Sequence, residues 1–116
     1  MDKFVEGTQH LCQKGETVFL DEERSGRICD VFRMLSEPSR LKIVVALLGG
    51  ELCVYHILEA VGGTQSAVSH QLRVLKDNRV VRARRAGQNV YYSLADEHVC
   101  QIVKMGLQHA ACGGER

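Results

Sequence analysis

The stretch QSAVSHQLRVLKD, residues 65–77, predicts an amphipathic helix around which the rest of the chain is organised. Its apolar side is formed by residues that recur at helical spacing: Ala67, Val68, Leu72 and Leu75. The opposite side carries hydrogen-bonding side chains and one cation: Gln65, Ser66, Ser69, His70, Gln71 and Arg73. Short hydroxyl and amide groups can approach base edges in a DNA major groove closely, so this face is suited to reading a base sequence.

The residues before this helix predict a helix-turn-helix. Thr64 is placed to cap the helix, and Gly62 and Gly63 offer a tight turn after a short helix at about 54–61. In a helix-turn-helix the second helix is the one that enters the major groove. The polar helix at 65–77 therefore occupies the reading position.

Two further helices are predicted upstream. The first, at 21–35, has its apolar residues on one face: Ile28, Val31, Phe32 and Leu35. The segment SEPS at 36–39 ends it and starts the next helix, with Ser36 as the expected cap. The second helix, roughly 39–48, is dense in Leu, Ile and Val, and we expect it to form the buried centre of the fold.

Beyond residue 77 the chain predicts a β-hairpin and a final helix at about 97–111. VVRARR (80–85) and NVYYSL (89–94) are strand-like runs on either side of the turn residues 86–88. The hairpin is basic and has a polar tip: Arg82, Arg84, Arg85 and Gln88. A basic hairpin alone is commonly a solvated edge, but beside a polar reading helix it predicts phosphate or minor-groove contacts. The predicted fold class is mainly α with a small β-hairpin, a winged helix-turn-helix.

Charge is concentrated where these motifs lie. The formal net charge of the chain is only +1. Residues 65–92 nevertheless hold six basic side chains and one acidic side chain, whereas residues 1–64 hold seven basic and ten acidic side chains. A basic segment in an otherwise near-neutral protein is a footprint for a polyanion. The sequence therefore favours double-stranded DNA as a partner.

Length and composition predict one domain. With 116 residues, 45% of them hydrophobic, the chain can fill a single small core, which a partner subunit would enlarge. We expect a mobile arm or loosely held helix at 1–20, the domain at 21–112 and a tail at 113–116. No apolar run approaches the roughly 18 residues of a membrane span, and no signal peptide is seen, so the sequence indicates a cytoplasmic protein with no membrane contact. Its five cysteines are then expected to be reduced.

The final helix contains the pattern D-x-H-x10-H-x2-C, formed by Asp96, His98, His109 and Cys112. At about 100° per residue, the two histidines return to the same face within roughly 20°. They are nevertheless on the order of 16 Å apart along the axis, too far to share one ion. Two copies paired antiparallel across a two-fold axis would bring each end opposite the other and create two equivalent sites.

Taken singly, each of these four residues is commonly just an exposed helix residue or a terminal thiol. As a set whose spacing closes across a homodimer, they predict a metal site. Two imidazoles, one carboxylate and one thiolate suit tetrahedral Zn(II).

A weaker second candidate site lies near the start of the helix at 54–61. Cys53 and His56 can face the same way, and His10 and Cys12 on the N-terminal arm could reach them from either subunit. The alternative is that Cys53 is simply a small buried apolar residue. Cys29 and Cys100 have no ligand-like neighbours in sequence and are expected in the core.

Three segments resemble the ArsR/SmtB family of dimeric, metal-responsive bacterial repressors: LSEPSRLKIVVALLGGELCVYHI, TQSAVSHQLRVLKDNRVVRARRAGQNVYYSL and DEHVCQIVKMGLQH. The resemblance covers roughly residues 28–112. It implies that the helix at 65–77 reads an operator, that the hairpin is the wing and that metal binding releases DNA. The family's zinc sensors use the four positions named above, commonly with His or Glu where this chain has Cys112. The family's thiol-rich sites usually have a second cysteine where this chain has Tyr55.

The expected function is a repressor that Zn(II), or alternatively Cd(II), releases from an operator with an inverted repeat. A thiolate ligand makes a Ni(II) or Co(II) site less favourable. The alternative is a thiol-based redox or sulfide sensor of the same fold, using two of Cys29, Cys100 and Cys112. An enzyme is not expected, because no phosphate loop or nucleophile elbow is present and four protein ligands leave a metal no open position for substrate.

Overall fold

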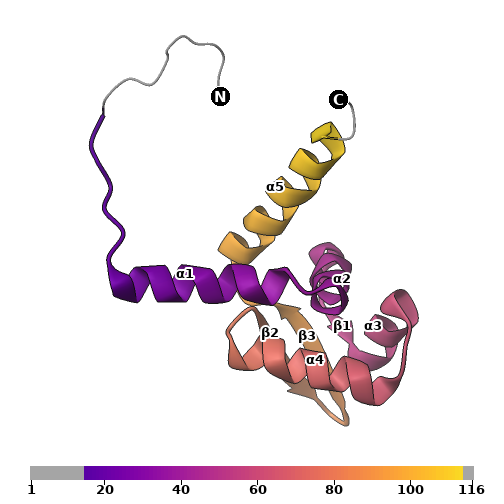
Figure 1. Ribbon diagram of the computed structural model, residues 1–116. Coiled ribbons are helices and arrows are strands. Elements are labelled where there is room, and N and C mark those ends of the chain that lie inside the picture. The colour runs from indigo at the N-terminus through magenta and orange to yellow at the C-terminus, as the bar shows by residue number, and fades with distance from the viewer. Residues whose placement is uncertain (1–14, 114–116) are drawn as a thin grey trace.

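A computed structural model describes residues 15–113 of the chain. In chain order the elements are α1 (Glu22–Leu35), α2 (Pro38–Ala46), the 3-10 turn η1 (Leu47–Gly49), β1 (Leu52–Cys53), α3 (Val54–Val61), α4 (Gln65–Asp77), β2 (Val81–Ala86), β3 (Asn89–Leu94) and α5 (Glu97–Gly113). Figure 1 shows α2, α3, α4 and the sheet gathered into one body, from which α5 projects. Within the described residues, the predicted helices, hairpin and overall fold class are confirmed.

The strands form one antiparallel sheet in the order β1-β3-β2. The hairpin pairs Val81 with Leu94 at its base and Ala86 with Asn89 at its tip, where Gly87 has a φ of +65°. The short strand β1 adds Leu52 and Cys53 to the free edge of β3. The sequence did not predict β1, because two residues carry no alternation that could mark a strand.

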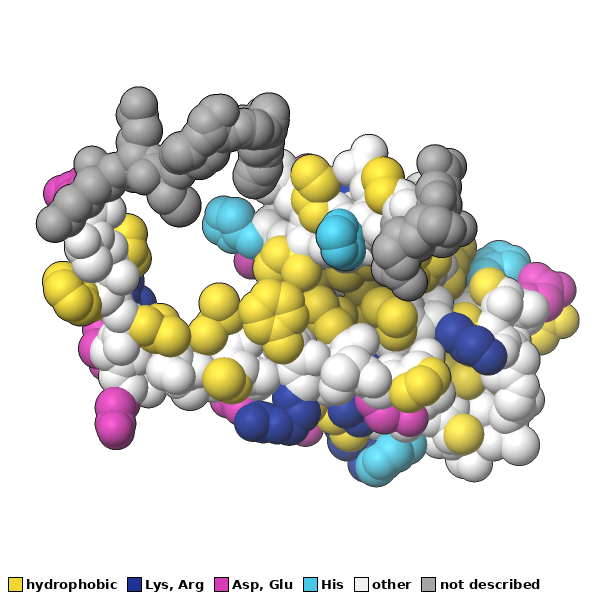
Figure 2. All heavy atoms as spheres, turned by 45° about the horizontal axis from the view of Figure 1, so that its top comes forward, with side chains coloured by type: hydrophobic (Ala, Val, Ile, Leu, Met, Phe, Trp, Pro, Cys, Tyr) yellow, Lys and Arg dark blue, Asp and Glu magenta, His cyan; other side chains and the backbone are white. Residues whose placement is uncertain are grey.

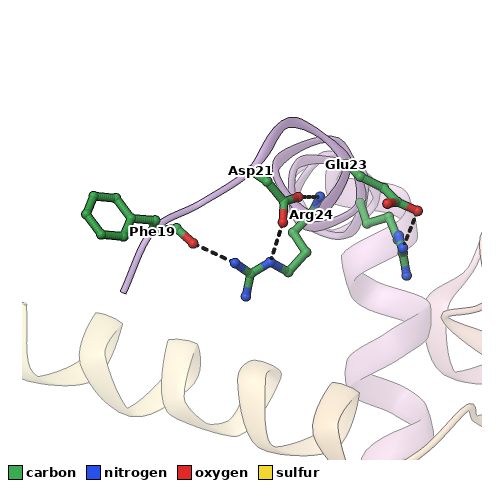
Figure 3. Close-up of polar contacts among 5 residues, drawn as sticks. Phe19, Asp21, Glu23 and Arg24 are labelled. Carbon is green, nitrogen blue, oxygen red and sulfur yellow. Dashed lines mark hydrogen bonds and ion pairs between the residues drawn. The ribbon is translucent and has the colours of Figure 1, made fainter. Parts of the chain in front are cut away.

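The N-terminus of α1 lies where the sequence predicts it, at residues 21–22. The Asp21 side chain caps the helix by accepting a hydrogen bond from the backbone N–H of Arg24 at 2.8 Å. The Arg24 side chain also donates to Asp21 at 3.1 Å and to the carbonyl oxygen of Phe19 at 2.5 Å, which holds the preceding segment against the helix (Figure 3).

The break between the first two helices differs in detail from the prediction. Glu37, not Ser36, caps α2 by accepting from the backbone N–H of Arg40, and Pro38 occupies the first turn. Ser36 instead closes α1, donating from its hydroxyl to the carbonyl oxygen of Arg33 at 3.0 Å. Serine is a common cap, but Pro38 fixes where α2 begins and leaves Glu37 directly before it.

The core lies between α2, α3, α4, the sheet and the start of α5. Its buried members are Ile43, Val44, Leu47, Ile57, Val68, Leu72, Leu75, Val80, Val81, Val99 and Val103. Full burial of one such side chain is worth about 1.5–3 kcal/mol. The expectation that the second helix is central is confirmed, since α2 and η1 supply three of these residues. Ala67, expected on the apolar side of α4, is exposed in the first turn of that helix.

The helices α1 and α5 are far less covered. None of the residues of α1 is buried within the described chain, and α5 buries only Val99 and Val103 near its start. Cys29 is consequently exposed and Cys100 is partly exposed, so the expectation that both lie in the core is wrong for a single chain. The reason is that the described chain buries no residue of α1 and, of α5, only Val99 and Val103. No helix in residues 15–113 is long and apolar enough to cross a membrane.

Candidate nucleic-acid interface and metal-binding positions

The helix α4, which the sequence predicts to read DNA, is fixed by its buried side. Thr64 accepts a hydrogen bond from the backbone N–H of Ala67 at 3.2 Å, capping the helix as predicted. Gly62 and Gly63 take φ values of +81° and +88°, a conformation that residues with a Cβ rarely adopt. The turn between α3 and α4 therefore depends on both glycines.

The predicted reading face of α4 is largely open to solvent. Val68, Leu72 and Leu75 are anchored in the core. The exposed residues on the other side are Gln65, Ser66, His70 and Arg73. Ser69 is partly exposed. The helix is thus held on one side while its polar groups remain available for hydrogen bonds outside the chain.

Gln71 is the exception on that face. Its side-chain amide donates to the Ser39 hydroxyl at 3.1 Å, and its carbonyl oxygen accepts from Arg40 at 3.5 Å. Arg40 also donates to the carbonyl oxygen of Met34 at 3.0 Å. Gln71 therefore connects α4 to the start of α2. The sequence offered no signal for this contact, because the partners lie 31 and 32 residues apart.

The wing places its cations on both faces. Side chains alternate along a strand, so Arg82 and Arg84 share one face of β2 and Arg85 lies on the other. Arg82, Arg85 and the tip residue Gln88 are exposed, and residues 15–113 supply no ion pair to either of these two arginines. These side chains are free to meet a polyanion.

Arg84 is engaged within the chain. Its Nε and Nη2 atoms donate to the two carboxylate oxygens of Glu51 at 2.9 and 2.7 Å. The guanidinium also lies 5.1 Å from the ring centroid of Tyr91. The hydrogen bond from Arg84 lowers the pKa of the Glu51 carboxyl below its ordinary value, despite an opposing effect of desolvation. Sequence reasoning missed Glu51, which no motif marks.

The four candidate metal ligands fall into two pairs at opposite ends of α5. Asp96 caps this helix by accepting from the backbone N–H of Val99 at 3.0 Å, and the same carboxylate oxygen lies 3.7 Å from Nδ1 of His98. His98 is 89% exposed. His109 and Cys112 are exposed near the other end of the same unbroken helix. In the described part of one chain, no three His, Cys, Asp or Glu residues converge on a point where they could hold a metal.

The weaker candidate site is half assembled. Cys53 and His56 lie together, with 3.4 Å between Sγ and Nδ1, at the start of α3. Cys53 is only partly buried. The other two candidates, His10 and Cys12, lie outside the described residues.

A surface cleft of about 390 Å³ lies beside Asp96 and His98. It is bounded by the start of α5, by α1, and by the last residue of α4 and the two residues after it, 77–79. The Asp96–His98 end of α5 is therefore adjacent to the C-terminal end of α4.

Comparisons with known proteins point to one family. The model described as "Bacterial regulatory protein, arsR family" matches residues 37–83. A transcriptional repressor SmtB homolog from Synechocystis sp. is 44% identical over 94 residues, covering 81% of this chain and 70% of that protein. A cadmium resistance transcriptional regulatory protein CadC homolog from Staphylococcus aureus is 41% identical over 115 residues, covering 88% of this chain and 93% of that protein.

Solved structures agree with the fold. The antimony-specific transcriptional repressor AntR superposes with a TM-score of 0.79 at 30% identity, over 91% of this chain and 100% of that chain. The homodimeric winged helix-turn-helix DNA-binding domain Mb0332 from Mycobacterium bovis gives a TM-score of 0.72 at 28% identity, over 82% and 91% of the two chains. The predicted winged helix-turn-helix is confirmed by these likenesses.

Proposed function

This chain belongs to the arsR family of bacterial regulatory proteins, which are DNA-binding transcriptional regulators and not enzymes, and from that premise we propose that it is a metal-sensing repressor. In this proposal the protein binds an operator with an inverted repeat as a homodimer. Zn(II), or Cd(II), bound between the two copies of α5 releases it. The observation that carries the proposal is that one unbroken helix holds two pairs of metal-type donors at its two ends, beside an apolar surface that the described chain leaves open.

The uncovered apolar surface supports the homodimer. Ile28 and Phe32 on α1 and Ile102, Met105 and Leu107 on α5 remain between 38% and 61% exposed. Figure 2 shows hydrophobic side chains gathered along α1 and α5 on one side of the molecule. A stable protein interface removes about 1,200–2,000 Å² from water, and two helices facing their own copies are of the right size to contribute such an area.

DNA contact would use the surface described above. Two copies of α4 enter successive major grooves and present Gln65, Ser66, Ser69, His70 and Arg73 to base edges and phosphates. The wings lie alongside, with Arg82, Arg85 and Gln88 meeting the backbone or the minor groove. Gln71 acts from the edge of this surface, because its amide already bonds to α2.

The donor set of α5 fits zinc. Asp96 and His98 of one copy would meet His109 and Cys112 of the other, giving a carboxylate, two imidazoles and a thiolate for a tetrahedral ion. Asp96 already lies 3.7 Å from His98 while capping the helix with one oxygen, and its second oxygen can serve as a ligand. Antiparallel pairing of two copies brings together the two ends that lie on the order of 16 Å apart in one chain.

Release from DNA would follow from a change in dimer geometry. The donors lie on α5, not on α4, so a bound ion cannot occupy the place of DNA. It would favour a dimer arrangement in which the two reading helices are displaced from their half-sites. Asp96 and His98 border the same cleft as the C-terminal end of α4, and this proximity supports the route.

An anaerobic titration with Zn(II), Cd(II), Co(II) and Ni(II), in which operator binding is measured at each metal concentration, tests the proposal. Zinc should saturate at one ion per chain and weaken operator binding. Mixing a His98→Ala chain with a His109→Ala chain should leave one of the two interfacial sites intact in the heterodimer, because its ligands all come from unmutated halves. Full tight binding by either mutant homodimer would show that the shared site is wrong, and His56→Ala in the same background removes any contribution from Cys53 and His56.

A thiol-based redox or sulfide sensor of the same fold is the second candidate. The exposed thiols of Cys29 and Cys112 and the partly exposed thiol of Cys100 favour it. Loss of operator binding in metal-free protein, after an oxidant with a disulfide found by mass spectrometry or after an organic persulfide donor with a persulfide found, would favour this function over metal sensing.

A further inference from the structure

Arg84 belongs to a row of side chains that crosses the whole sheet. The register pairs Arg84 of β2 with Tyr91 of β3, and Tyr91 with Cys53 of β1. Directly paired residues on neighbouring strands point to the same face, so these three side chains share one face of the sheet. Glu51 precedes Cys53 by two residues and reaches the Arg84 guanidinium over the same face.

The contact between Glu51 and Arg84 has the geometry of a specific clamp. Both donors on one edge of the guanidinium are used, each toward a different carboxylate oxygen. The flat cation rests against the Tyr91 ring, which lies on the strand between the two partners. Bidentate pairing fixes orientation as well as distance, and this makes the clamp more restrictive than a pair of point charges.

The clamp joins the two parts of the molecule that would meet DNA. Glu51 lies immediately before β1, and β1 leads without a break into α3, the first helix of the helix-turn-helix. Arg84 lies in the middle of the wing strand β2. The backbone hydrogen bonding between these two parts is limited, because β1 pairs with β3 over only two residues. The side-chain clamp therefore adds a second connection between the wing and the helix-turn-helix.

We propose that Glu51 is a positioning residue for DNA binding, which holds Arg84 against Tyr91 and so fixes the wing relative to the reading helix. Arg84 then contributes through wing placement, and the phosphate contacts of the wing fall to Arg82 and Arg85. The paired Glu51 carboxylate cancels the charge of Arg84, so a phosphate gains little from approaching this guanidinium. The inference rests on the proposed contact of the wing with operator DNA.

The test compares operator affinity and its salt dependence in five variants: Glu51→Gln, Glu59→Gln, Arg84→Ala, Arg84→Glu and the double variant that combines Arg84→Glu with Glu51→Arg. Glu51→Gln keeps the shape of the side chain but removes its charge, and it should weaken operator binding by about twofold to fivefold, the range expected when an exposed ion pair is lost. The slope of log affinity against log salt should stay unchanged, because no phosphate contact is lost. Glu59→Gln, which neutralises another exposed glutamate on the neighbouring helix α3, is the matched control and should bind as wild type does.

A charge swap separates positioning from direct contact. Arg84→Glu alone should weaken binding by more than tenfold, because it sets two carboxylates against each other. Adding Glu51→Arg restores a clamp of the opposite polarity and should return affinity to within about threefold of wild type. Thermal unfolding of each variant, with zinc binding by α5 as a second measurement, establishes that the fold and dimer persist.

Three results would overturn the inference: an unchanged affinity in Glu51→Gln, no recovery in the folded double variant, or tighter binding in Glu51→Gln together with a salt slope about one unit shallower in Arg84→Ala. The last pattern would make Arg84 a direct phosphate ligand and Glu51 its competitor. If wild type itself fails to select an inverted repeat, the proposed function fails instead, so the two failures are distinguishable.

Discussion

Replacing Phe32 with alanine should weaken dimerisation far more than it weakens the fold of each chain. Phe32 is 53% exposed in a single copy, on the α1 face that we assign to the partner. A phenylalanine side chain offers roughly 150–250 Å² for burial, so covering the exposed half would remove on the order of 100 Å² from water in each copy. At about 25 cal/mol per Å² this is worth about 2.5 kcal/mol per copy.

A two-fold interface contains the residue twice, so the upper estimate for the dimer is about 5 kcal/mol. Alanine keeps its Cβ and a partner covers any side chain incompletely, so we expect a loss of at least about 2 kcal/mol. That corresponds to a rise in the dimer dissociation constant of about 30-fold or more. Operator affinity at low protein concentration should fall with it, since two reading helices must act together.

Sedimentation equilibrium over a wide range of protein concentration measures the dissociation constant directly. Tyr55→Ala is the matched control, because Tyr55 is an aromatic residue that is 66% exposed but lies on α3, outside the proposed interface. The control should dimerise as wild type does. A Phe32→Ala dissociation constant within threefold of wild type, or an equal loss in the control, would refute the assignment of the α1 face to the partner.

Four other predictions address sensing, recognition and stability. His109→Ala should bind operator within about twofold of wild type but no longer lose affinity on addition of zinc, and an undiminished zinc response would contradict the proposed sensor. Ser69→Ala should relax base preference, whereas Arg85→Ala should weaken all sequences alike and make the salt slope shallower by about one unit; equal effects on discrimination would argue against these roles. Leu72→Ala, at a site with 0% exposure, should cost about 2–5 kcal/mol in urea unfolding without a change in the m-value. Hydrogen bonds from the start of α2 lower the pKa of Glu37 below its ordinary value of 4.5, so its contribution to stability is present above that pH and is lost as pH falls through the lowered pKa. Glu37→Gln keeps an acceptor at the cap and should make stability less dependent on pH between neutrality and acid, which acid titration of the unfolding midpoint can check.

The residues that were correctly located from sequence share a local signal. Thr64, the two glycines before it and the apolar spacing of Val68, Leu72 and Leu75 all act within a few residues of one another, and they determine α4 and its turn. The hairpin is equally local, because Gly87 and the two flanking β-prone runs define it.

The contacts that the sequence did not predict join distant residues. Glu51 and Arg84 are 33 residues apart, and Gln71 is 32 residues from Ser39. The order of residues does not distinguish the Glu51–Arg84 pair from any other pair of a carboxylate and a cation. It likewise does not distinguish the Gln71–Ser39 pair from any other pair of an amide and a hydroxyl. The exposure of Cys29 was missed for a related reason: helical periodicity shows that a face is apolar, but not whether the same chain or another copy covers it.

The sequence by itself thus determined the helices, the turn, the wing and the spacing of the candidate ligands on α5, because each follows from hydrogen bonding and apolar periodicity over one or two turns of chain. Only the tertiary structure decided that Arg84 is held by Glu51, that Gln71 ties α4 to α2, and that α1 and α5 present an uncovered apolar surface. These features depend on which surfaces meet once the elements pack, and packing depends on the whole set of contacts at once.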